Sequence, residues 1–251
     1  MTLPQRDPYP VEVLEYLAQA QERYWWHTSR NQILVWVLER WCKEVNRLLE
    51  VGCGNGFVLG ALEKAYPNAE LIGAEFMEDS LAVARARLPQ AKFIRLDVCA
   101  MDATEAYDVI GAFDVLEHIE DDEKALANLQ RALRRGGHLL ITVPQHRWLW
   151  SAIDERVCHV RRYSRSELVG KVERAGLTVE YVTSFVSLLL PLMWLSRRRS
   201  QSEDAWKREL EIHPLLNAAL KAVMQLELAL LKANVRFPVG GSLLVLAAKP
   251  A

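Results

Sequence analysis

The stretch that decides the fold is "NRLLEVGCGNGFVLGAL", residues 46–62. An apolar run typical of a buried β-strand leads into Glu50, three glycines then alternate with other residues, and a helical pattern begins at Phe57. Glycine permits positive φ, and it lets a ligand approach the backbone because no side chain is in the way. Taken alone, the G-x-G-x-G turn fits either a nucleotide-like ligand or a tight turn with a purely structural role.

Composition limits the classes of function. The chain has 251 residues, and its 31 Lys and Arg nearly balance 32 Asp and Glu, so the net charge of -1 gives no case for nucleic acid as a partner. Its four cysteines lack CxxC or zinc-type spacing, as is usual in a reduced compartment. The N-terminal residues do not form a basic patch followed by an apolar stretch, so a signal peptide is not expected and a cytoplasmic location is.

Strand and helix patterns alternate along most of the chain. Strands are expected at 47–52, 69–75, 91–98, 107–119 and 138–144, and the helix before the last of them is expected over 121–137. Strands separated by helices of this length favour parallel pairing through right-handed crossovers, hence an α/β fold with a doubly wound sheet. Such sheets bind ligands beyond the carboxyl ends of their strands, where the glycine turn lies.

Acidic residues stand at the ends of the first three expected strands. Glu75 follows Glu50 by about 25 residues, near the spacing at which dinucleotide folds place an acid on ribose hydroxyls. Asp97 ends the third strand, well placed to accept a hydrogen bond from an adenine amino group. Three such acids beside a glycine turn favour a nucleoside-containing ligand over three unrelated solvated carboxylates.

These motifs together resemble those of class I S-adenosylmethionine-dependent methyltransferases. The segments "LLEVGCGNGF", "LIGAEF", "RLDV", "FDVLEHI" and "LRRGGHLLITVP" occur in that family's order and spacing, over about residues 47–185. The resemblance implies a mostly parallel, seven-stranded Rossmann-like sheet that binds S-adenosyl-L-methionine and releases S-adenosyl-L-homocysteine. It also implies a catalytic core at 45–190 with an N-terminal helical cap at 1–44, a helical insert or lid at 191–237 and a final strand at 238–251.

The resemblance assigns cofactor contacts residue by residue. Glycines 52, 54 and 56 would line the methionine part of the cofactor and Glu50 would contact its ammonium group. Glu75 would bind the ribose hydroxyls, and Asp97 with the backbone of Val98 would bind the adenine. Phe113 and Asp114 would border the sulfonium. The cofactor-binding residues expected in this way are Arg30, Glu50, Gly52, Gly54, Gly56, Glu75, Phe76, Asp97, Val98 and Phe113.

Two other classes of function stay open. An NAD-linked oxidoreductase is less well supported, since such enzymes usually carry G-x-G-x-x-G and position 57 is Phe. A non-catalytic accessory protein would hold the same cofactor unchanged and act on a partner through the helical insert. An enzyme would convert the cofactor to S-adenosylhomocysteine with some acceptor, whereas the accessory protein would not.

Methyl transfer to a hydroxyl needs a proton acceptor as well as alignment. His118, in "DVLEHIED" just beyond the fourth strand, is the expected general base, because histidine titrates near neutral pH. Many members of the resembled family have Glu-His here. The competing interpretation is that Glu117 and His118 only support the following helix. His118 is the sole reason for favouring oxygen over nitrogen or carbon as the acceptor atom.

The segment 144–168 follows the fifth strand and gathers titratable groups. A similar H-x-R-R-Y-S segment borders the acceptor pocket in a bacterial subset of the family, so His146, His159, Arg162 and Tyr163 are expected to bind substrate. Arginine forks also suit an anionic acceptor, although they often pair with nearby acids. A metal held by His146, Asp154 and His159 is an alternative, but the spacing is not that of a metal motif and no metal is expected.

The N-terminal stretch "YWWHTSRNQIL", residues 24–34, resembles the entry helix of the same subset. The resemblance implies that Trp26 roofs the pocket, as an acceptor-binding residue, and that Arg30 meets the methionine carboxylate. Aromatic side chains exclude water and a guanidinium pairs with an acid, but an aromatic helix packed as core explains the same residues.

The C-terminal region departs from a minimal enzyme of this type. A helical insert of roughly 45 residues separates the last two expected strands, as a lid, a dimer interface or an acceptor platform. The apolar run at 185–199 is too short to span a bilayer, so burial is favoured there and a peripheral membrane contact is the alternative. The expected partner is a small-molecule or lipophilic acceptor.

Overall fold

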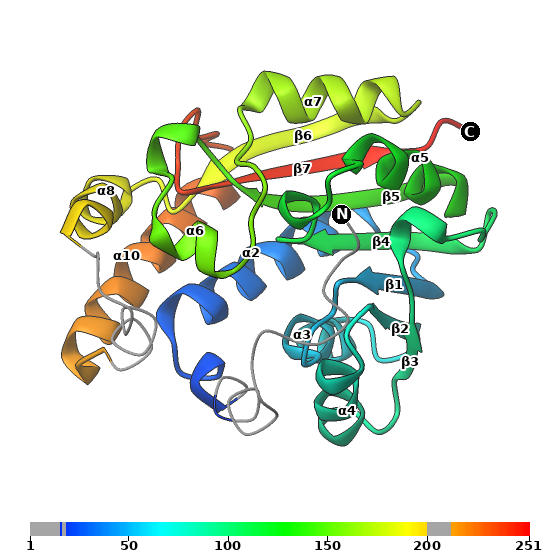
Figure 1. Ribbon diagram of the computed structural model, residues 1–251, viewed down its shortest axis with the longest axis horizontal. Coiled ribbons are helices and arrows are strands. Elements are labelled where there is room, and N and C mark those ends of the chain that lie inside the picture. The colour runs from blue at the N-terminus through cyan, green and yellow to red at the C-terminus, as the bar shows by residue number, and fades with distance from the viewer. Residues whose placement is uncertain (1–15, 17–18, 200–211) are drawn as a thin grey trace.

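The sheet has seven strands in the order β3-β2-β1-β4-β5-β7-β6. A computed structural model describes residues 16, 19–199 and 212–251. Neighbouring strands from β3 to β5 pair in parallel, and β7 pairs antiparallel with both β5 and β6 (Figure 1). The strand bounds are β1 Arg47–Val51, β2 Glu70–Glu75, β3 Lys92–Arg95, β4 Tyr107–Phe113, β5 Leu133–Pro144, β6 Thr178–Phe185 and β7 Ser242–Ala248. This confirms the expected mostly parallel seven-stranded fold.

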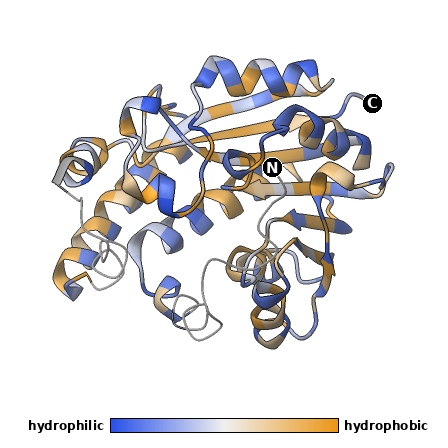
Figure 2. Cartoon of the chain, viewed as in Figure 1, coloured by the Kyte–Doolittle hydropathy of each residue, from blue (hydrophilic) through white to orange (hydrophobic). Residues whose placement is uncertain are grey.

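Helices cover both faces of the sheet, and the strands between them are largely apolar (Figure 2). One buried cluster joins the sheet to α5 (Asp122–Ala132) and α7 (Arg165–Arg174). The other joins it to α2 (Trp25–Trp41), α3 (Phe57–Ala65) and α10 (Pro214–Lys232). The remaining helices are α4 Glu78–Arg87, α6 Ala152–Arg156 and α8 Leu190–Arg199, with short 3-10 turns η1 Val98–Ala100, η2 Leu116–His118 and η3 Arg147–Leu149.

Several expected element boundaries were wrong, among them the end of the third strand, which lies at Arg95 and not at residue 98. Two differences are larger. The helix expected over 121–137 ends at Ala132, because Leu133 already pairs with Tyr107 of β4 at the start of β5. The strand expected to reach residue 119 ends at Phe113, after which the chain turns into η2. Both errors arise from tertiary pairing that local sequence patterns do not contain.

The N-terminal helix and the insert pack against each other. The backbone N–H of Trp25 donates to Asn217 Oδ1 at 2.9 Å, and Asn217 Nδ2 donates to the carbonyl of Arg23 at 2.8 Å. Glu227 of α10 is fully buried and accepts from the backbone N–H groups of Ser187 and Leu188 after β6. Helices α2 and α10 thus form one layer over the sheet, although 172 residues separate them in the chain.

Part of the insert exposes apolar side chains. Leu192 and Leu195 of α8 are exposed, as are Leu215 and Leu216 at the start of α10. Helix α10 is also long and apolar enough to cross a membrane by length and composition, a test that core helices of soluble proteins pass as well. The membrane contact at 185–199 stays a prediction, and residues 200–211 lie outside the described part of the chain.

Candidate functional site

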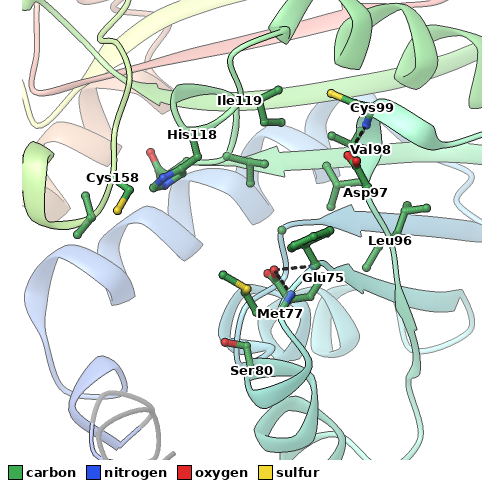
Figure 3. Close-up of a pocket in the computed structure, with 17 residues that line it drawn as sticks. Glu75, Met77, Ser80, Leu96, Asp97, Val98, Cys99, His118, Ile119 and Cys158 are labelled. Carbon is green, nitrogen blue, oxygen red and sulfur yellow. Dashed lines mark hydrogen bonds between the residues drawn. The ribbon is translucent and has the colours of Figure 1, made fainter. Parts of the chain in front are cut away.

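A cavity of about 320 Å³ opens at the carboxyl ends of β1, β2, β3 and β4. In Figure 3, Glu75, Met77 and Ser80 lie on one side of it, Asp97 and Val98 on another, and His118 and Cys158 across from them. The predicted site residues that line it are Gly52, Glu75, Phe76, Asp97, Val98 and His118. The cavity is therefore at the ligand edge that the topology of an open α/β sheet provides.

The glycine turn is shaped by close packing beneath the cavity. Gly52 has φ +64°, and a Cβ atom there would lie 2.3 Å from Cγ2 of Val115. Gly54 has φ +51°, but a Cβ atom there would meet nothing within 4 Å. The first glycine is thus required by the fold, whereas the second keeps open space at the loop tip, as close approach of a ligand to the backbone requires.

Glu75 ends β2 with its carboxylate directed at the glycine loop. Oε2 accepts from the backbone N–H of Gly54 at 3.0 Å, and Oε1 accepts from those of Phe76 and Met77 at 2.7 and 3.1 Å. A carboxylate has roughly four acceptor positions, so these three bonds leave capacity for a ligand hydroxyl. Glu75 therefore both fixes the loop and faces the cavity.

Asp97 and Val98 form the next wall of the cavity. Asp97 Oδ1 accepts from the backbone N–H of Cys99 at 2.8 Å, which starts η1. The carbonyl of Val98 accepts from Asn128 Nδ2 of α5 at 2.9 Å, so the turn is anchored to the core. The second carboxylate oxygen of Asp97 takes part in no hydrogen bond among the described residues.

Glu50 does not line the cavity but lies buried behind the loop. It pairs in register with Gly73 of β2 and Gly111 of β4, so strands cover it on both sides. Its Oε2 atom has no hydrogen-bond partner among the described groups. Burial, with some help from the charge of Glu75 and against that of Arg30, raises the pKa of Glu50 to about 8. The buried Glu50 carboxyl is therefore mostly protonated at neutral pH.

We expect the Glu50→Gln variant to be more stable than the wild type, and we expect this difference in the free energy of unfolding to grow with pH. Because the folded-state pKa is raised, wild-type stability is highest below the unfolded pKa and falls as pH rises toward about 8. An isosteric amide does not ionise, so it should raise the free energy of unfolding by about 3–4 kcal/mol more near pH 8 than near pH 5. Urea denaturation of both proteins at the two pH values measures this, and an equal effect at both would contradict it.

Arg30, Asp114 and Trp26 form a group beside the cavity. The Arg30 guanidinium makes an ion pair with Asp114, which lines the cavity, and stacks over the Trp26 ring at 4.6 Å. Asp114 has φ +58°, an uncommon conformation that clusters at functional sites. Arg30, Trp26 and Phe113 are not among the lining residues, and Phe113 is buried in the core cluster of α2, α3 and α10. Their cofactor and acceptor contacts stay predictions.

His118 and His159 meet at the edge of the cavity. Their ring centroids are 4.7 Å apart in an edge-to-face arrangement. Burial, reinforced by His159, lowers the pKa of His118 to about 4. The His118 ring is therefore neutral at physiological pH, so one ring nitrogen has a lone pair that can accept a proton. Because its pKa is low, however, the ring is a weak base.

Several polar and charged side chains of the segment 144–163 pair with other side chains of the protein. Arg162 donates from Nε and Nη2 to the two oxygens of buried Asp154 at 2.7 and 3.0 Å. Tyr163 is fully buried and its hydroxyl donates to Asp122 Oδ2 at 2.7 Å. His146 stacks on Trp148, with φ +64°. Because none of the three lines the cavity, acceptor contacts by His146, Arg162 and Tyr163 stay predictions without geometric support.

Sequence reasoning missed several apolar walls of the cavity. They are Met77, Leu96, Val115, Ile119 and Val157, together with Ser80, Cys99 and Cys158. Met77, Leu96 and Val115 each lie within two residues of a strand end or an expected site residue, so their position alone carried a signal. Val157 and Cys158 lie in the segment 144–168, which was expected to border the acceptor pocket, but the contacts expected there were its polar residues and not these two.

Residues 24–182 match a family model described as a methyltransferase domain. The chain is 36% identical over 182 residues to trans-aconitate 2-methyltransferase of Variovorax paradoxus (strain S110), covering 70% of this chain and 65% of that protein. It is 30% identical over 164 residues to a probable S-adenosylmethionine-dependent methyltransferase of Mycolicibacterium smegmatis, covering 64% and 62%. The chain thus spans less than two thirds of the length of these relatives.

The fold has relatives among solved structures. Phosphoethanolamine N-methyltransferase 2 of Haemonchus contortus, in complex with S-adenosyl-L-methionine, superposes with a TM-score of 0.59 at 20% identity, covering 88% of this chain and 53% of that one. The chain belongs to the methyltransferase-domain family, and its sheet is the Rossmann-like sheet of S-adenosylmethionine-dependent methyltransferases.

Proposed function

We propose that the protein is an S-adenosyl-L-methionine-dependent methyltransferase that acts on a small or lipophilic acceptor. The observation that carries the proposal is the shared cavity of Gly52, Glu75 and Asp97, which come from the ends of three adjacent strands. One loop offers open backbone, and two carboxylates stand on neighbouring walls. This combination suits a ligand with a zwitterionic tail, a vicinal diol and an amino-substituted base.

Each part of the cofactor then has a partner. The methionine part lies along the glycine loop, and the ribose hydroxyls donate to Glu75. The adenine amino group donates to Asp97, and the apolar walls at Leu96, Val98 and Met77 enclose its ring. The sulfonium methyl then points toward Asp114 and His118, on the opposite side. The protein's contribution to catalysis is mainly alignment of the acceptor with the methyl group, because the sulfonium is already activated.

The acceptor enters beside His118, Ile119 and Cys158. No lysine or arginine lines the described cavity, and the nearby guanidinium groups of Arg30 and Arg162 already pair with Asp114 and Asp154. Among the described residues, a tricarboxylate such as trans-aconitate, the substrate in the name of one relative, would therefore meet no unpaired cation lining this cavity. An acceptor with one oxygen nucleophile and an otherwise apolar body suits the walls better, and oxygen remains the acceptor atom that His118 favours.

Calorimetric titration of the purified chain with S-adenosylmethionine, S-adenosylhomocysteine and NAD tests the proposal. We expect saturable binding of both S-adenosyl compounds and none of NAD, with affinity reduced in Asp97→Ala. Preference for NAD, or no binding of either S-adenosyl compound, would overturn it.

Release of S-adenosylhomocysteine in an acceptor screen separates an enzyme from a binding protein. Turnover that is unchanged in His118→Ala, with intact cofactor affinity, would remove His118 as a base.

A further inference from the structure

Glu117, His118 and His159 form a cluster of which the proposed methyl transfer uses only His118. Each offers one ligand atom, and these atoms lie within 4.8 Å of one another. Glu117 and His118 belong to η2, whereas His159 follows α6. The two segments are tied together, since the backbone N–H of Val160 donates to the Glu117 carbonyl at 2.8 Å.

The Glu117 carboxyl group is buried without a hydrogen-bond partner in the described part of the chain. It is 0% exposed, and neither oxygen has a hydrogen-bond partner among the described groups. The two arginines whose charge acts on the Glu117 carboxyl, Arg30 and Arg162, are paired with Asp114 and Asp154. A buried carboxyl without partners costs roughly 1–3 kcal/mol or more, so a fold that retains one usually supplies a ligand for it.

His159 is held in the orientation that a metal ligand needs. Its Nδ1 lies 2.9 Å from Asp154 Oδ1, and its Nε2 lies 3.8 Å from Glu117 Oε1. Asp154 is an acceptor only, so Nδ1 donates to it, and Nε2 is the ring atom that faces Glu117. Asp154 is itself fixed by Arg162, Arg197 and Ser151. A carboxylate behind a histidine in this way is the usual outer support of a metal-bound imidazole.

We propose that Glu117, His118 and His159 bind a divalent transition-metal cation at the wall of the cavity. Two imidazoles and one carboxylate suit Zn²⁺, Mn²⁺ or Fe²⁺ and leave coordination positions open. Bonds of about 2.1 Å place neighbouring ligand atoms roughly 3.0–3.4 Å apart. Side-chain rotations that draw the most distant of the three atoms together by up to about 1.8 Å would therefore complete the site.

The open coordination positions face the acceptor side of the cavity, because His118 lines it. A bound cation there would take an acceptor oxygen as a ligand and lower the pKa of its hydroxyl, with His118 acting as a ligand instead of a base. This role rests on the proposed function, whereas metal binding itself does not. The sequence predicted no metal, and the alternative set considered there, His146, Asp154 and His159, shares only His159 with this cluster.

Metal binding is tested on the tag-free full chain after treatment with a chelator. Calorimetry with Zn²⁺ and Mn²⁺, and absorption spectra with Co²⁺, are expected to show one saturable site. Glu117→Gln and His159→Asn should each weaken it at least about tenfold and change the Co²⁺ spectrum. His138→Ala is the matched control, because His138 lies 3.2 Å from Glu180 in a histidine–carboxylate pair that lacks a third ligand. That variant should bind metal like the wild type.

S-adenosylhomocysteine affinity is measured on every variant as a readout of folding. Retained cofactor binding with lost metal binding supports the site, whatever the acceptor is. Absence of saturable binding of all three metals to a chain that binds the cofactor would overturn it. Undiminished metal binding in both Glu117→Gln and His159→Asn would also overturn it. Failure of cofactor binding in the wild type instead would refute the proposed function, and urea denaturation of each variant would then serve as the readout of folding for the metal result.

Discussion

Replacing Glu75 with alanine is expected to weaken the binding of S-adenosylhomocysteine by at least about 100-fold. A hydrogen bond to a charged group contributes about 1.5–3 kcal/mol, and the proposed ribose contact supplies at least one in the acceptor position that the three backbone bonds leave open. The carboxylate also fixes the glycine loop through the backbone N–H of Gly54, so its removal loosens the surface on which the methionine part lies. Titration calorimetry on both proteins gives the ratio of affinities.

The control for this variant is Glu70→Ala, at the opposite end of β2. Glu70 pairs with Arg47 and Lys92 on the far edge of the sheet, so its loss should leave the affinity unchanged. A ligand that lacks the 2′-hydroxyl separates direct contact from loop support. If Glu75 contacts the ribose, this ligand binds the wild type more weakly and loses less affinity in Glu75→Ala than S-adenosylhomocysteine does. Equal losses for both ligands would assign Glu75 to the loop alone.

Local patterns in the sequence were enough to predict the sheet and the side of the cavity that Glu75 and Asp97 form. Strand and helix periodicity predicted the parallel core, and acids at strand ends predicted Glu75 and Asp97. Glu50 has the same residue type at a similar place, yet it is buried between Gly73 and Gly111 of the flanking strands. Which face of a strand end opens to the cavity depends on register and on the neighbouring strands, and spacing along one strand does not contain this information.

The acceptor side was harder to predict because its charges pair over long distances. Tyr163 bonds to Asp122, 41 residues earlier, and the same Asp122 also binds Lys171. A sequence shows that Arg162 and Tyr163 are polar and follow a strand, as substrate-binding residues do. It does not show that their partners are already present in the protein. The triad of Glu117, His118 and His159 was missed for the same reason, since 40 residues separate its segments.

The second large effect is expected at Asp154, where substitution by asparagine should destabilise the fold by about 3–5 kcal/mol. Asp154 and Arg162 are both buried and form a bidentate ion pair. Among the described residues, no other carboxylate forms an ion pair with Arg162. Although burial alone would raise it, hydrogen bonds from His159 and Arg162 hold the pKa of Asp154 well below its usual range. An asparagine there leaves the buried guanidinium without its counter-charge, and urea denaturation should show a lower midpoint at an unchanged slope.

Glu123→Gln is the comparison, because Glu123 pairs with Arg174 at 2.8 Å on the exposed surface. Surface pairs contribute about 0–1 kcal/mol, so this variant should unfold close to the wild type. Combining Asp154→Asn with Arg162→Met removes both buried charges, and the double variant should be less destabilised than the sum of the single ones. Additive losses would mean that Asp154 acts through Arg197 or His159 instead of Arg162. The buried pair would then be a consequence of packing and not the anchor that holds His159 at the cavity.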